Sequence, residues 1–149
     1  MYQHTQPAWT IRFLALTVLT IQQLILEFVE PNPEADSAFP FVIGGMSVLL
    51  FILWSMTIQV TETHIRHWFG IGFWKKEIPL STIQHIKLSK SAWYNGYGIR
   101  FVGNGWLYNV SGLDRIELHL QNNKVVYLGT DDPNGLVQHI SEVLDETGH

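Results

Sequence analysis

The sequence contains no cysteine and few charged residues. Without cysteine there is no disulfide framework, no thiolate metal site and no cysteine nucleophile. Only 15% of the 149 residues are charged, whereas 46% are hydrophobic and six are tryptophan. This length suits one ordinary domain with a modest appendage. Low charge and high apolar content together are typical of a chain that lies partly in lipid.

Basic residues are nearly absent from the first part of the chain. Residues 1–60 contain one basic residue, Arg12, and four acidic ones. Residues 61–110 contain six basic residues against two acidic ones, and residues 111–149 contain two against seven. The net charge of −4 therefore conceals a basic middle, which indicates a surface directed toward a partner.

A long uncharged stretch runs from Ser37 to Thr61. Its apolar part, Phe41 to Ile58, would as a helix cross roughly 27 Å of hydrocarbon. We predict a transmembrane span over about residues 39–59. The alternative is a buried core helix, which would need a larger protein around it.

A second, weaker span is predicted over about residues 9–29. Arg12 and Glu27 lie near its ends, and Gln22 and Gln23 fall inside it, where a neighbouring helix can supply hydrogen-bond partners. A signal peptide is the rival interpretation, but no basic cluster precedes the apolar run and no small-residue cleavage site follows it. The short connection Glu30 to Ser37 would join the two spans into a hairpin, and residues 1–60 would comprise an N-terminal tail and this hairpin.

The flanking charges predict the orientation of this hairpin. The connection has no Lys or Arg, whereas basic residues follow the second span. The positive-inside rule then places both termini in the cytoplasm, in a multi-pass protein of the cytoplasmic (inner) membrane.

Residues 61–149 read as a mainly-β domain that ends in a helix. Short segments rich in β-branched and aromatic residues, such as "HIRHWF" and "GFWKKEI", are separated by turn-prone residues. "RIELHLQNNKVVYLGT" (115–130) alternates apolar and polar residues around Asn122 and Asn123, which predicts a hairpin. After Pro133, an apolar stripe containing Leu136 and Ile140 predicts an amphipathic helix that covers the sheet.

The glycine-rich stretch "GYGIRFVGNG" (96–105) raises the question of a phosphate-binding loop. A strand pattern follows Gly98, and Phe101 occupies the position where the dinucleotide fingerprint requires its third glycine. These glycines are more typical of turns, bulges and close backbone approach in a curved sheet.

The layout resembles the bacterial pleckstrin-homology-like (PH-like) membrane proteins, in which a transmembrane hairpin precedes a PH-like domain. The resemblance rests on "RHWFGIGFWKKEIPLSTIQHI" (66–86), "WYNGYGIRFVGNGWLYNVSG" (93–112) and "IELHLQNNKVVYLGTDDPNGLVQHI" (116–140). It implies a curved antiparallel β-sandwich or barrel over residues 61–149, capped by the C-terminal helix. It implies no activity and no phosphoinositide-binding motif.

The basic, aromatic middle is the strongest functional signal. We predict a surface for anionic lipid head groups or for another membrane protein, although many of its aromatic residues suit a β core. The predicted surface residues are Trp74, Lys75, Lys76, Lys87, Lys90 and Arg100. Nucleic acid is a poorer partner because the C-terminal segment is acidic.

No catalytic residue, metal ligand or cofactor is predicted. The seven histidines are scattered, and His64 and His67 would point to opposite faces of a strand. We therefore expect a membrane-anchored binding or assembly module and not an enzyme, with the bilayer as one partner and the oligomeric state open. The alternative is a membrane-linked enzyme or a metal-binding protein that uses the histidines.

Overall fold

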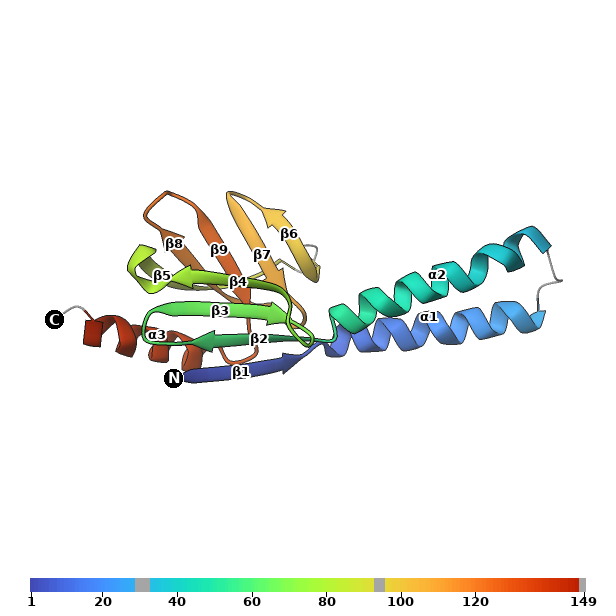
Figure 1. The fold of residues 1–149 in the computed structure, drawn as a ribbon, viewed down its shortest axis with the longest axis horizontal. Coiled ribbons are helices and arrows are strands. Elements are labelled where there is room, and N and C mark those ends of the chain that lie inside the picture. The colour runs from blue at the N-terminus through green and yellow to red at the C-terminus, as the bar shows by residue number, and fades with distance from the viewer. Residues whose placement is uncertain (29–32, 93–95, 148–149) are drawn as a thin grey trace.

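The computed structural model describes residues 1–28, 33–92 and 96–147. Within these ranges the chain forms a β-body of two sheets and a helical hairpin that projects from one end of it (Figure 1). The C-terminal helix lies against the β-body on the side away from the hairpin (Figure 1).

The first sheet is antiparallel and has the order β1-β2-β3-β4. Its strands are β1 (Tyr2–Pro7), β2 (Ser55–Val60), β3 (His64–Phe69) and β4 (Phe73–Pro79). On β3, Ile65, His67 and Phe69 are buried, whereas the residues between them are half-buried. This alternation has the period of a strand with one face toward a core. β4 is the last strand of the sheet and pairs only with β3 among the strands described.

The second sheet has the order β5-β8-β9-β7-β6. Its strands are β5 (Ile83–Lys90), β6 (Gly98–Val102), β7 (Gly105–Asn109), β8 (Asp114–Leu120) and β9 (Val125–Gly129). A 3-10 turn, η1 (Leu80–Thr82), connects the two sheets. β7 and β9 run parallel, and the other neighbouring pairs are antiparallel.

The core lies between the sheets and is closed by α3 (Pro133–Thr147). Leu136 and Ile140 of α3 are fully buried in the same cluster as Ile116 and Leu118 of β8. The Oδ1 atom of Asp132 accepts a hydrogen bond from the Gly135 N–H at 3.0 Å and caps the helix start. The predicted helix and its inward stripe are confirmed.

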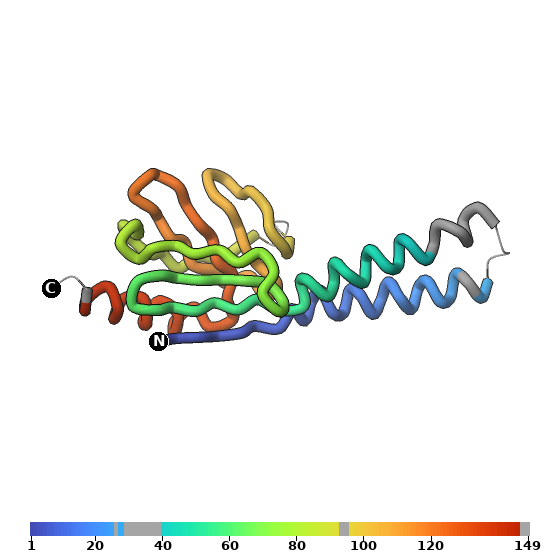
Figure 2. Tube along the Cα trace, viewed as in Figure 1, coloured from blue at the N-terminus to red at the C-terminus, as the bar shows by residue number. Residues whose placement is uncertain are grey.

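The two hairpin helices interrupt the connection between paired strands. α1 (Trp9–Phe28) follows β1, and α2 (Pro33–Ile52) precedes β2, so the chain leaves the sheet and returns to the neighbouring strand (Figure 2). The N–H of Ala8 donates to the carbonyl of Trp54 at 3.0 Å, which ties the two ends of the excursion together.

The predicted transmembrane spans, and with them the membrane hairpin in the predicted fold class, are wrong. The described ranges contain no helix that is both long enough and apolar enough to cross a bilayer. The apolar run from Phe41 to Ile58 is divided, because α2 ends at Ile52 and the rest of the run enters β2. Its helical part covers only about 18 Å, short of a hydrocarbon core of roughly 30 Å.

The predicted location rested on those spans. α1 contains Arg12, Gln22, Gln23 and Glu27, and α2 begins with a polar turn. The predicted multi-pass topology in the cytoplasmic membrane, with both termini in the cytoplasm, is therefore wrong as well. Part of the predicted connection Glu30 to Ser37 falls on residues 29–32, which lie outside the described residues.

The mainly-β part of the prediction agrees with the structure, with one strand missed. The predicted hairpin forms β8 and β9, with Asn123 in the turn at a φ of 60°. β1 was interpreted as part of an N-terminal tail, yet it pairs with β2 from Tyr2 to Pro7. The predicted division at residues 60 and 61 thus has strands of the first sheet on both sides of it.

Candidate binding site between the two sheets

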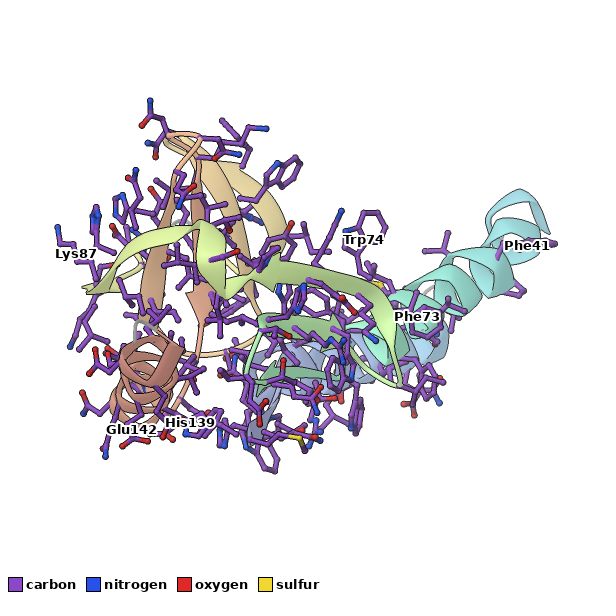
Figure 3. The ribbon with its side chains drawn as sticks, turned by 60° about the vertical axis from the view of Figure 1, so that its left-hand side comes forward. Phe41, Phe73, Trp74, Lys87, His139 and Glu142 are labelled. Atoms are coloured by element: carbon purple, nitrogen blue, oxygen red, sulfur yellow. The ribbon has the colours of Figure 1, made fainter. Side chains whose placement is uncertain are left out.

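The six predicted surface residues lie on three strands, β4, β5 and β6. Trp74, Lys75 and Lys76 are on β4, at one edge of the first sheet. Lys87 and Lys90 are on β5, and Arg100 is on β6, at opposite edges of the second sheet. In Figure 3, Lys87 lies on the far side of the β-body from Trp74.

Three of the predicted cations are close to acidic groups. The Lys75 ammonium is 3.6 Å from the Glu77 carboxylate, and the Lys90 ammonium is 3.9 Å from Asp114. Lys87 lies opposite Glu117 in the strand register. Exposed ion pairs of this kind contribute little free energy, so they mainly neutralise the local charge.

A cavity of about 310 Å³ brings two of the predicted residues together with side chains from the opposite sheet. β3 and β4 contribute one wall, and β6, β7 and β9 contribute the other. The lining residues are His67, Trp74, Lys76, Glu77, Ile78, Ile99, Trp106, Tyr108 and Val126. The cavity thus lies where the two sheets separate at the β4 edge.

The pleat of β4 explains why Lys76 reaches this cavity. Lys76 lies opposite His67 in the register, and Ile78, two residues on, is buried between the sheets. Residues two apart on a strand share a face, so Lys76 belongs to the inner face although its side chain is exposed. At Trp74, where the register shifts, the backbone has a φ of 53°, which is unusual for a bulky residue.

His67 is the buried polar group of the site. Its side chain is fully buried, and neither ring nitrogen has a hydrogen-bond partner in the described part of the chain. Burial, with a smaller contribution from the charge of Lys76, lowers the pKa of His67 to about 4. The ring is therefore neutral at neutral pH, with one nitrogen able to donate and the other able to accept a hydrogen bond.

Aromatic rings form the walls and the rim of the cavity. The Tyr108 ring is 4.4 Å from the His67 ring, and burial raises the pKa of Tyr108. Trp74 is 62% exposed, Trp106 is 49% exposed, and Phe101 packs edge-on against Trp106 at 5.7 Å. Figure 3 shows Trp74 near the end of β4 that adjoins the helical hairpin. Large aromatic side chains that stay exposed beside a cavity offer apolar contact area to a partner.

A second polar cluster lies on the second sheet, among residues that alternate with the buried Ile116 and Leu118 of β8. The rings of His85 and His119 stack at 4.0 Å, and His119 is 3.3 Å from Glu117. Burial alone would raise the pKa of Glu117, but hydrogen bonds from Ser89 and His119 and nearby cations outweigh it and lower the pKa. Across the described ranges, no three histidine or acidic side chains come together in a way that could hold a metal ion.

The sequence contains a signal for the burial of His67, which the metal-site interpretation overlooks. In "HIRHWF", His67 falls between Ile65 and Phe69 on the inward face of a strand. The spacing of His64 and His67 by itself raises only the question of a metal site. A histidine at an inward position between two apolar residues is the pattern that would have predicted a buried, neutral imidazole.

Comparison of the chain with models of known protein families, with curated proteins and with solved structures returns no match. The predicted identification as a PH-like membrane protein with an N-terminal transmembrane hairpin is therefore wrong: no family match supports it, and the described helices do not span a membrane.

Proposed function

We propose that the protein is a binding module whose cavity between β4 and β7 receives an extended segment of a partner protein. The segment carries a large apolar side chain next to a carboxylate. The observation that carries the proposal is the buried His67, without a hydrogen-bond partner among the described residues, in a cavity that also contains Lys76.

The polar groups of the cavity favour an acidic ligand group. Lys76 has no ion pair with any residue in the described ranges, unlike its neighbour Lys75. A carboxylate that enters the cavity would pass the Lys76 ammonium and accept a hydrogen bond from the neutral imidazole at the inner end. Charge-assisted hydrogen bonds of this kind are stronger than neutral ones, and a buried group without a partner gains most from one.

The rim favours a protein segment over a small molecule. Trp74, Phe101 and Trp106 remain exposed around the cavity, and exposed tryptophans are typical anchors of protein interfaces. β4 is also an edge strand, so an extended segment could add main-chain hydrogen bonds along it. A small ligand would leave most of this rim uncovered.

Two other functions have less support. Lys75 and Lys76 could still contact an anionic lipid surface, as the sequence predicts. The other predicted cations, however, lie on the edge strands of the other sheet. A role in catalysis or metal binding through the histidines lacks a three-residue cluster within the described ranges.

A random peptide display library tests the proposal. The full-length chain should enrich peptides in which Asp or Glu lies next to Trp, Phe or Leu. Lys76→Glu should raise the dissociation constant of these peptides by about tenfold or more, equivalent to about 1.4 kcal/mol of binding free energy. Lys87→Glu is the matched control, because Lys87 is an exposed lysine on β5, on the far side of the β-body from Trp74 (Figure 3), and it should leave binding unchanged.

Two outcomes would contradict the proposal. No enrichment, or peptides that bind the Lys76→Glu variant as tightly as the unchanged chain, would refute a site in this cavity. Salt-sensitive binding to anionic but not neutral vesicles, without peptide enrichment, would assign the surface to lipid instead.

A further inference from the structure

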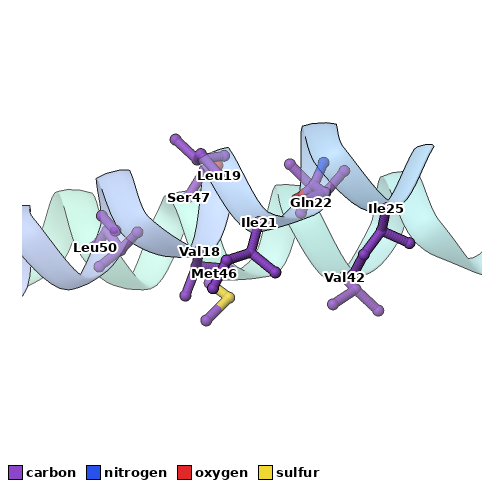
Figure 4. A pocket seen from close by; sticks show the side chains of 11 residues that line it. Val18, Leu19, Ile21, Gln22, Ile25, Val42, Met46, Ser47 and Leu50 are labelled. Carbon is purple, nitrogen blue, oxygen red and sulfur yellow. The ribbon is translucent and has the colours of Figure 1, made fainter. Parts of the chain in front are cut away.

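The helical hairpin exposes more apolar surface than its own packing covers. α1 and α2 lie side by side and enclose a cavity of about 240 Å³ (Figure 4). Away from that cavity, large apolar side chains on both helices face solvent. Leu16 is 61% exposed, Val48 is 60% exposed and Phe51 is 56% exposed. Contiguous exposed apolar surface on this scale marks an interaction surface.

One face of α1 combines this apolar surface with two opposite charges. At about 100° per residue, Arg12, Leu16, Leu19, Gln23 and Glu27 fall within an arc of roughly 80°. Leu16 and Leu19 lie between the two charges along the helix. Arg12 lies in the first turn of α1, next to β1, and Glu27 lies in its last turn.

Both charges lack an ion-pair partner in the part of the chain that the structure describes. The Arg12 guanidinium contacts the Trp9 ring at 5.0 Å and the Trp54 ring at 4.1 Å, and its Nη2 donates to the Trp54 carbonyl at 3.4 Å, but no carboxylate among the described residues pairs with it. Glu27 is exposed and forms none of the ion pairs found among the described residues. Neither charge is therefore neutralised by an ion pair within the described part of the chain.

We propose that this face of α1 pairs with the same face of a second copy of the chain, in the antiparallel direction. A two-fold axis between Leu19 and Thr20 then brings Arg12 of each copy opposite Glu27 of the other. It also brings Leu16 of each copy opposite Gln23 of the other, and it places the two β-bodies at opposite ends of the dimer. In a parallel pair, Arg12 would face Arg12 and Glu27 would face Glu27, and these like charges would repel. The charge pattern therefore complements a second copy of the same face in the antiparallel direction.

The absence of cysteine makes the geometry testable by disulfide cross-linking. Thr20→Cys, on an exposed position beside the axis, should form a covalent dimer with itself. Leu16→Cys mixed with Gln23→Cys should form the mixed dimer in preference to either homodimer. Phe28→Cys at the exposed end of α1 and Ile71→Cys on the β-body are controls that should form no covalent dimer.

Sedimentation equilibrium of the full chain tests the charges independently. Glu27→Arg should raise the dimer dissociation constant by about tenfold or more, and Arg12→Glu combined with Glu27→Arg should restore it. Glu142→Arg, on an exposed site of α3, is the control and should change nothing. A chain that stays monomeric at all concentrations, or self-cross-linking of Phe28→Cys in place of Thr20→Cys, would overturn the proposal.

Discussion

The imidazole of His67 lies against the phenol ring of Tyr108, with ring centroids 4.4 Å apart and planes inclined by 55°. The two residues come from different sheets, so this contact joins the sheets at the inner end of the cavity. The contact gives the imidazole an aromatic neighbour but no hydrogen bond. His67 therefore belongs both to the contact between the two sheets and to the proposed binding site.

The first prediction concerns acid stability. The unfolded chain protonates His67 near pH 6.5, whereas the folded chain does so only near pH 4. Between these values the unfolded state binds more protons, so stability is lost as the pH falls from about 6.5 toward 4. Between pH 7 and pH 5, the protonation of His67 alone should lower the free energy of unfolding by about 2 kcal/mol. Chemical denaturation at both pH values measures the loss.

His67→Phe and His67→Leu provide the comparison for this prediction. Both remove the titrating group, so their loss of unfolding free energy between pH 7 and pH 5 should be smaller by about 2 kcal/mol. Because a buried polar group without a partner is replaced by an apolar one, stability at pH 7 should fall little or rise. Parallel pH profiles for variant and unchanged chain would show that His67 is not held neutral by burial.

The second prediction concerns the helix that closes the core. Leu136 and Ile140 are fully buried one turn apart on α3. Truncating either one to alanine should lower the free energy of unfolding by about 2–5 kcal/mol, because burial is lost and a cavity remains. Glu146→Ala, on the exposed face of the same helix, is the control and should stay within about 0.5 kcal/mol. Equal effects at all three positions would mean that α3 does not close the core.

The third prediction concerns close backbone approach at Gly105. A Cβ atom at this position would overlap the carbonyl group of Val125 on β9, so Gly105→Ala must push apart two paired strands. We expect a loss of at least about 2 kcal/mol in unfolding free energy, measured by thermal or denaturant unfolding. Gly44→Ala in α2 has open space around it and should be neutral or stabilising by up to about 1 kcal/mol. A Gly105→Ala chain as stable as Gly44→Ala would contradict the pairing of β7 with β9.

Local patterns were sufficient to predict most of the β-body. The alternation around Asn122 and Asn123 predicted β8 and β9, and the stripe through Leu136 and Ile140 predicted α3. These signals lie within one element or one hairpin, where periodicity and turn chemistry determine which side chains face inward. β1 carries little of this signal, because its place is determined by pairing with residues 48 to 58 positions away.

The apolar run from Phe41 to Ile58 led to the wrong prediction of a membrane span, because it contributes to both α2 and β2. The run from Phe41 to Ile58 contains no break in hydropathy at Ile52, yet the chain leaves the helix there and enters a core strand. Apolar residues suit both a helix and a buried strand, so the run alone could not distinguish them. The cavity could not be predicted either, because His67 and Tyr108 are brought together by the packing of two sheets.

The most direct measurement is an NMR titration of the ¹⁵N-labelled full chain with a peptide from the display selection. The proposed site predicts shifts in the indole N–H signals of Trp74 and Trp106, which line the cavity. The indole signals of Trp9 and Trp54, at the base of the helical hairpin, should stay in place. In the Lys76→Glu variant the same peptide concentration should leave all four signals unchanged. Shifts at Trp9 and Trp54 with none at Trp74 and Trp106 would contradict binding between the sheets.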